Sequence, residues 1–126
     1  GQHWIFIGII GKNSTHDQYS YCDPTAYGFA APSQCYVGGV DSGFNTQFLD
    51  GTTGNSVDFS SGHIIDILLN LDKGELKFKN NTTGSRYKMQ IPQQNRSIEF
   101  TPHFNIYNSG NKITVKPLPT LKSGKI

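Results

Sequence analysis

The segment SGHIIDILLNLDKGELKFKNN, residues 61–81, predicts two antiparallel strands joined by a tight turn. Its first strand places alternate side chains on one mainly apolar face, which holds His63, Ile65, Ile67, Leu69 and Leu71. The other face of that strand holds Ile64, Asp66, Leu68 and Asn70. Because this second face mixes apolar and polar groups, we expect the strand to be buried on one side and half-buried on the other.

The turn and the second strand continue this pattern. Residues 72–74 (DKG) combine an Asp that can bond its own backbone with a Gly that accepts a positive φ. In the strand that follows, Leu76 and Phe78 point to the core. The intervening charged side chains point to water: Glu75, Lys77 and Lys79. We expect the rest of the chain to pack against or beside this hairpin.

Short apolar runs separated by turn residues occur throughout the chain. Further strands are predicted in residues 3–10, 27–37 (two short strands broken at Pro32), 87–91, 98–108 and 112–118. Long loops are predicted in 11–26 and 38–56. The pattern is typical of an all-β antiparallel sandwich of two sheets, of the concanavalin or jelly-roll type. The 126 residues suit one domain over 1–118, followed by a tail at 119–126.

Three groups of residues resemble the SPRY (B30.2) domain family. The central hairpin matches the family at Gly62, Ile64, Ile65, Leu69, Leu71, Asp72, Gly74, Leu76, Phe78 and Asn80. The first strand and the segment after the long loop match at Trp4, Ile7, Gly8, Ile9, Tyr27 and Gly28, and Tyr36 to Gly39 follow as the next strand and turn. The closing hairpin matches at Phe100, Pro102, Phe104, Gly110, Ile113 and Val115.

This resemblance implies a SPRY-type sandwich that acts as a non-catalytic protein–protein interaction module. Such modules are often attached to a ubiquitin-ligase or signalling scaffold, and they recognise a peptide or partner domain through loops at one end. The family usually has strands before the tryptophan strand, whereas only three residues precede Trp4 here. We therefore expect an open sheet edge, which predicts self-association or completion by a partner.

The loops also contain residues suited to recognition, because tyrosine offers contact area and a hydroxyl with few rotors. The candidate partner-binding residues are Tyr19, Tyr21, Tyr27, Tyr36, Phe44 and Phe48, with Asp17, Asp23 and Asp41 as polar contacts. Alternatively, the rings of Tyr19 and Tyr21 cover the edge of the core and anchor their own loop. A carbohydrate-binding module or lectin would use the same tyrosines as stacking platforms. A third alternative is a structural piece whose binding partner completes the missing sheet edge.

Catalytic and metal motifs are not apparent. Glu75 and Glu99 lie in separate predicted strands, and no GxSxG sequence occurs, so we do not expect an enzyme. Cys22 and Cys35 do not have zinc-ligand spacing, and no phosphate-binding loop is present, so neither a metal nor a cofactor is expected. We interpret the two cysteines as free thiols of a cytoplasmic protein.

Charge is unevenly distributed although the formal net charge is only +2. Residues 1–72 contain one base and seven acids, whereas residues 73–126 contain ten bases and two acids. Such a division can signal an anionic partner, but it would disappear if the two halves interleave in space. Without an RNA-binding motif or a helix to enter a groove, we expect no nucleic-acid partner. No apolar run is long enough to span a membrane.

Overall fold

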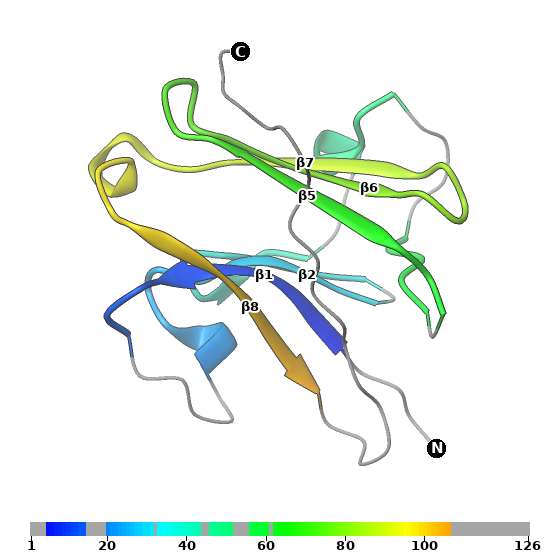
Figure 1. The fold of residues 1–126 in the computed structure, drawn as a ribbon, viewed down its shortest axis with the longest axis horizontal. Coiled ribbons are helices and arrows are strands. Elements are labelled where there is room, and N and C mark those ends of the chain that lie inside the picture. Colours follow the sequence, from blue (N-terminus) through cyan, green and yellow to red (C-terminus); the bar gives the residue numbers. More distant parts are fainter. Residues whose placement is uncertain are drawn as a thin grey trace.

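Two antiparallel sheets make up the computed structural model, which describes residues 5–14, 20–31, 33–43, 46–51, 56–60 and 62–106. Within these ranges the chain forms strands and short 3-10 helices and no α-helix, which confirms the predicted all-β sandwich (Figure 1). The predicted strand at 112–118, the tail at 119–126 and Trp4 lie outside the described residues.

The larger sheet has five strands in the order β4-β3-β2-β1-β8. These strands are β1 (Ile5–Gly11), β2 (Tyr27–Ala30), β3 (Gln34–Val37), β4 (Val40–Asp41) and β8 (Phe100–Ile106). The smaller sheet has the order β5-β6-β7, with β5 (Ile65–Asn70), β6 (Glu75–Asn80) and β7 (Arg86–Gln90). The 3-10 helices are η1 (Ser20–Cys22), η2 (Thr46–Phe48) and η3 (Gln93–Asn95).

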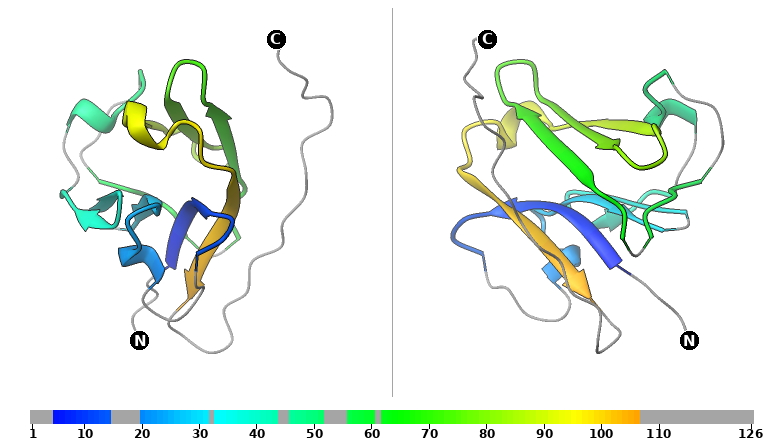
Figure 2. Two further views of the ribbon diagram at one scale, coloured as in Figure 1. Left: turned by 90° about the vertical axis from the view of Figure 1, so that its left-hand side faces the viewer. Right: turned by 45° about the vertical axis from the view of Figure 1, so that its right-hand side comes forward.

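The predicted central hairpin is formed by β5 and β6. Their register runs from Ile65 opposite Asn80 to Asn70 opposite Glu75, and Gly74 closes the turn with a φ of 67°. Its inward side chains follow the predicted alternation, since Leu76 and Phe78 of β6 are buried. The outward face of β5 is more exposed than expected. β5 is an edge strand of the smaller sheet, so it has a neighbouring strand on one side only in the described residues (Figure 2).

The main core lies between the two sheets and contains aromatic rings from both. Phe29 of β2 meets Phe78 of β6 edge to face, with ring centroids 5.0 Å apart. Phe48 of η2 and Tyr87 of β7 pack against the same Phe29 ring. This aromatic cluster holds the sheets face to face and fixes which side of each strand is buried.

A second, smaller core covers the opposite face of the five-stranded sheet. It consists of Phe6, Ala30 and Tyr36, with Tyr21 of η1 packed against it. Gly28 leaves room for the Phe6 ring, because a Cβ at that position would lie only 2.7 Å from Phe6 Cζ. Both faces of β1 and β2 are therefore covered, and the segment that contains η1 supplies part of the second layer.

Phe78 provides a direct test of the main core. We expect Phe78→Ala to lower the free energy of unfolding by about 3–5 kcal/mol, because the side chain is 1% exposed and its loss leaves a cavity. Ile64→Ala is the control: Ile64 is 65% exposed, so the change should be within about 0.5 kcal/mol. Urea unfolding followed by circular dichroism measures both, and equal effects would contradict this packing.

Candidate functional site: the outer face of the three-stranded sheet

The nine residues predicted to bind a partner do not share one surface. Asp17, Tyr19 and Phe44 lie outside the described residues. Tyr27 and Phe48 are buried between the two sheets. The Tyr27 hydroxyl accepts a hydrogen bond of 2.6 Å from an Asn95 side chain, which ties β2 to η3. Burial gives the rings of Tyr27 and Phe48 a packing role.

Three of the predicted residues meet on the outer face of the five-stranded sheet. Tyr36 of β3 lies opposite Asp41 of β4, and the Tyr21 ring packs edge to face on Tyr36 with centroids 5.1 Å apart. Tyr36 is buried and Tyr21 half-buried, as expected for rings that anchor a loop. Asp41 is exposed and accepts a hydrogen bond from the Gly43 backbone N–H.

Asp23 organises the loop in which it lies. Its carboxylate accepts hydrogen bonds from the Thr25 backbone N–H at 2.8 Å and from the Thr25 hydroxyl at 2.6 Å. The Ser14 hydroxyl donates to the same oxygen at 3.2 Å. Asp23 therefore joins the two ends of the segment that covers the second core. These hydrogen bonds within the chain explain why an aspartate lies at this position, so no binding protein has to be invoked for it.

Four cations gather on the outer face of the three-stranded sheet, and we call them the cationic block: Lys77, Lys79, Arg86 and Lys88. In the register of β6 and β7, Lys77 lies opposite Lys88 and Lys79 lies opposite Arg86. Like charges directly opposite one another weaken a sheet. All four side chains are exposed or half-buried, so they lie where an anionic group can reach them.

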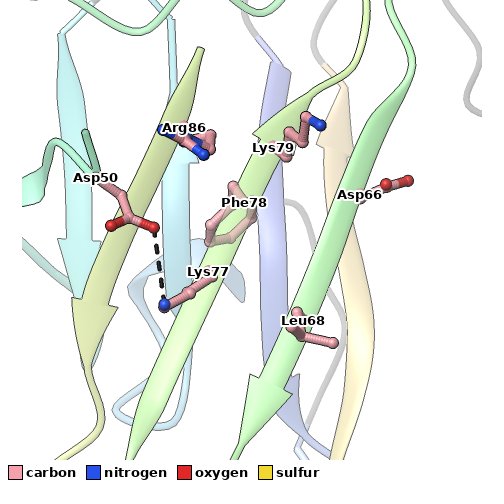
Figure 3. Close-up of a pocket in the computed structure, with 7 residues that line it drawn as sticks. All are labelled: Asp50, Asp66, Leu68, Lys77, Phe78, Lys79 and Arg86. Carbon is pink, nitrogen blue, oxygen red and sulfur yellow. Dashed lines mark ion pairs between the residues drawn. The ribbon is translucent and has the colours of Figure 1, made fainter. Parts of the chain in front are cut away.

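A shallow hollow of about 220 Å³ lies beside the cationic block. It is lined by Asp50, Asp66, Leu68, Lys77, Phe78, Lys79 and Arg86 (Figure 3). Figure 3 shows Asp50 and Asp66 on opposite sides, with the basic groups between them. Lys77 and Asp50 form an ion pair of 3.8 Å. Among the described residues, neither Lys79 nor Lys88 lies within ion-pair distance of a carboxylate.

The sequence contained a signal for this site in its uneven charge distribution. The basic strands β6 and β7 lie next to each other in the sequence and pair with each other, so their cations stay together even though β5 and the pairing of β8 with β1 bring the two halves side by side. Alternation then sends Lys77 and Lys79 of β6 to the same face as Arg86 and Lys88 of β7. Alternation along single strands does not reveal the site, because the register between β6 and β7 decides which cations lie opposite one another.

A polar network lies at one end of the same sheet. Asp58 accepts hydrogen bonds from the Tyr87 hydroxyl at 2.6 Å, the Ser85 hydroxyl at 2.7 Å and the Asn80 side-chain amide at 3.1 Å. The buried Asn80 amide also contacts a ring nitrogen of His63 at 2.9 Å. These bonds attach the segment that precedes β5 to the ends of β6 and β7.

The network holds Asp58 in its ionised form. Burial by itself would raise the pKa of this carboxyl, but hydrogen bonds from Tyr87, Ser85, Thr83 and Asn80 outweigh that effect and lower its pKa below its ordinary value. Burial and the Asp58 contact raise the pKa of Tyr87 to about 12, so its hydroxyl remains a donor at neutral pH. We assign this network a structural role, because it joins three segments of the fold.

A serine–histidine pair lies under the second core. Ser20 Oγ and His103 Nε2 are 2.6 Å apart, a separation compatible with a nucleophile and its base. Both side chains are buried, however, and Asn105 Nδ2 donates to the same hydroxyl at 3.4 Å. A substrate could not reach Ser20 while η1 keeps this position, so the pair is better explained as a connection between η1 and β8.

The cysteines are free thiols, as expected from the sequence. Cys22 is exposed, whereas burial, together with the nearby Asp41, raises the pKa of Cys35 to about 12. In the part of the chain that the structure describes, no three His, Cys, Asp or Glu side chains gather closely enough to hold a metal ion. None of the helical segments in the described ranges has the length and apolar character needed to cross a membrane.

No family model, curated protein or solved structure matches this chain. The resemblance to SPRY domains therefore stays a prediction based on the matching residues. The observed fold defines the broader class, an antiparallel β-sandwich whose smaller sheet exposes a charged outer face.

The Asp58 network predicts a specific pH dependence. Because folding lowers this pKa, its contribution to stability is complete above the pKa of the unfolded carboxyl, about 3.9, and is lost as the pH falls through the lower folded value. We expect Asp58→Asn to lower the free energy of unfolding by about 1–2 kcal/mol at neutral pH. In the acid range, the free energy of unfolding of this variant should depend less steeply on pH than that of the parent protein.

Asp72→Asn is the matched control, because Asp72 is exposed in the turn between β5 and β6. Its stability should follow that of the parent protein throughout the acid range. Urea unfolding at a series of pH values measures both variants. An Asp58→Asn protein whose stability falls as steeply with acid as the parent's would show that the network does not hold the carboxylate ionised.

Proposed function

We propose that this chain is a non-catalytic binding module that holds an extended, acidic segment of a protein partner on the outer face of its three-stranded sheet. The observation that carries the proposal is the cationic block, in which two like-charged pairs lie directly across β6 and β7. Such pairs weaken the isolated sheet, and a carboxylate placed between them would relieve the repulsion.

The hollow adds an apolar position to this charged surface. Leu68 of β5 lies opposite Lys77 of β6 and is 51% exposed. A partner segment with alternating acidic and apolar residues could place carboxylates on the block and an apolar side chain on Leu68. Both features lie on strands that are held rigidly by the core, which suits a preformed binding surface.

A protein partner fits this face better than a nucleic acid does. Asp50 and Asp66 flank the basic groups and would repel a phosphate backbone that crosses the sheet (Figure 3). The outward positions of the three strands carry no aromatic ring on which a base could stack: Asp66, Leu68, Asn70, Glu75, Lys77, Lys79, Arg86, Lys88 and Gln90. The mixed charges are more typical of a protein interface.

The sequence resemblance supports the same class of function. A SPRY-type module would bind a peptide or partner domain, and it would act as the recognition part of a ubiquitin-ligase or signalling scaffold. We place it in the cytoplasm, where the two cysteines would stay reduced. A lectin is less favoured, because Tyr27 and Tyr36 are buried and offer no open ring face for a sugar.

The proposal is tested with a fluorescein-labelled peptide of alternating Glu and Leu, whose binding to the full chain is followed by fluorescence anisotropy. The variant Lys79→Glu/Arg86→Glu replaces one like-charged pair by two acids. We expect its dissociation constant for the peptide to rise about tenfold or more, because charge complementarity is reversed. Added salt should weaken binding by the parent chain.

Lys12→Glu/Lys73→Glu is the matched control, since it changes net charge equally at exposed positions outside the block. Its affinity for the peptide should stay within about twofold of the parent's. Equal weakening by both double variants would show that net charge alone attracts the peptide. Tighter binding of a single-stranded oligonucleotide, lost through the block substitutions, would instead identify a nucleic-acid surface.

A further inference from the structure

The outer edge of β5 is open in the described part of the chain. No strand there pairs with this side of β5, whereas the other edge of the same sheet is covered. At that other edge Leu49 bridges to Tyr87, and the Asp50 backbone N–H donates to the Arg86 carbonyl at 3.1 Å. Among the described residues, β7 is thus protected and β5 forms the border of the sheet (Figure 1).

The backbone groups that face this edge belong to alternate residues of β5. The Asn81 N–H donates to the Ile64 carbonyl, so even-numbered residues of β5 exchange hydrogen bonds with β6. The N–H and carbonyl groups of Ile65, Ile67 and Leu69 consequently point away from the sheet. These residues turn their side chains to the core but are only partly buried, so the core itself is less covered along this edge.

Natural sheets usually protect such an edge with lysine, proline, a bulge or a very short strand. β5 reads IDILLN and contains neither lysine nor proline. It keeps register with β6 over six consecutive pairs without a bulge. β4 of the other sheet, in contrast, has only two residues. β5 therefore has the properties of a strand that accepts another strand.

We propose that β5 pairs with β5 of a second copy of this chain, in antiparallel orientation, to form a symmetric dimer with one continuous six-stranded sheet. Charge favours a second copy as the occupant. β5 is the strand of this sheet whose outward side chains include no base, so two copies can meet there without bringing their cationic blocks into contact.

In one antiparallel register, the side chains of β5 are complementary to those of β5 in the second copy. With Leu68 opposite Leu68 of the second copy, Asp66 lies opposite Asn70 of the second copy, and Ile67 lies opposite Leu69 of the second copy. The free backbone groups of Ile67 and Leu69 then form the hydrogen-bonded pairs, and the two Leu68 side chains meet at a closer, non-hydrogen-bonded position. Shifting the strands to place Asp66 against Asp66 of the second copy would oppose two carboxylates, which disfavours that register.

The mass of the full chain tests this proposal directly. Sedimentation equilibrium over a wide concentration range should show a monomer and a dimer, and Leu68→Lys should raise the dimer dissociation constant about tenfold or more by opposing two ammonium groups. Val40→Lys is the control, because Val40 is 64% exposed but belongs to the other sheet. A monomer at every concentration, or equal effects of the two variants, would overturn the proposal.

Hydrogen exchange on the unmodified protein provides a second measurement. The amides of Ile67 and Leu69 should become more protected as concentration rises, because pairing between copies satisfies them. Protection that is independent of concentration would show that another segment of the same chain covers this edge. Rapid exchange at all concentrations would show that the edge stays open, and either result would overturn the proposal.

Cross-linking tests the register itself in a Cys22→Ser background, since Cys22 is the exposed cysteine. A non-hydrogen-bonded antiparallel pair has Cα atoms about 4.5 Å apart, which is within reach of a disulfide. Leu68→Cys should therefore form a covalent dimer under mild oxidation. Ile64→Cys, on the same face and similarly exposed, should not, because this register places Ile64 opposite Asp72 of the second copy. Equal cross-linking of both variants would contradict the register.

Discussion

Phe29 of the larger sheet and Phe78 of the smaller sheet meet edge to face at the centre of the molecule, and the rest of the structure depends on this burial. A face that packs against another sheet has to be apolar, because a charge placed there would lose its hydration without finding a partner. The side chain of every second residue of β6 therefore packs into the core. The remaining residues of that strand are directed outward by the same constraint.

This constraint explains why so much positive charge lies on one face. The smaller sheet is made from one contiguous part of the sequence, and that part contains several lysines and an arginine. Their inward neighbours are apolar, so the cations of β6 and β7 share the outer face and lie opposite one another. The arrangement lowers the stability of the free sheet slightly, and it forms the positively charged surface on which the proposed acidic segment would bind.

The two sheets differ in how the chain covers them. The outer face of the larger sheet is covered by Phe6, Tyr36 and the half-buried Tyr21, and Asp23 ties down the segment that holds Tyr21. The smaller sheet has no comparable layer over its outer face in the described residues, and one of its edges remains open at β5. The surfaces proposed to bind partners are thus those that the described residues leave uncovered.

The sequence by itself determined the all-β class, the central hairpin and the inward positions of Leu76 and Phe78. These depend on alternation along a strand and on local turn chemistry, which neighbouring residues specify. It could not determine that Tyr27 and Phe48 are buried, or that the charged block forms between β6 and β7. Those features depend on which strands become neighbours and in what register, and contacts between residues distant in sequence decide both. The tertiary structure therefore moved the candidate site from the loops to a sheet face and its open edge.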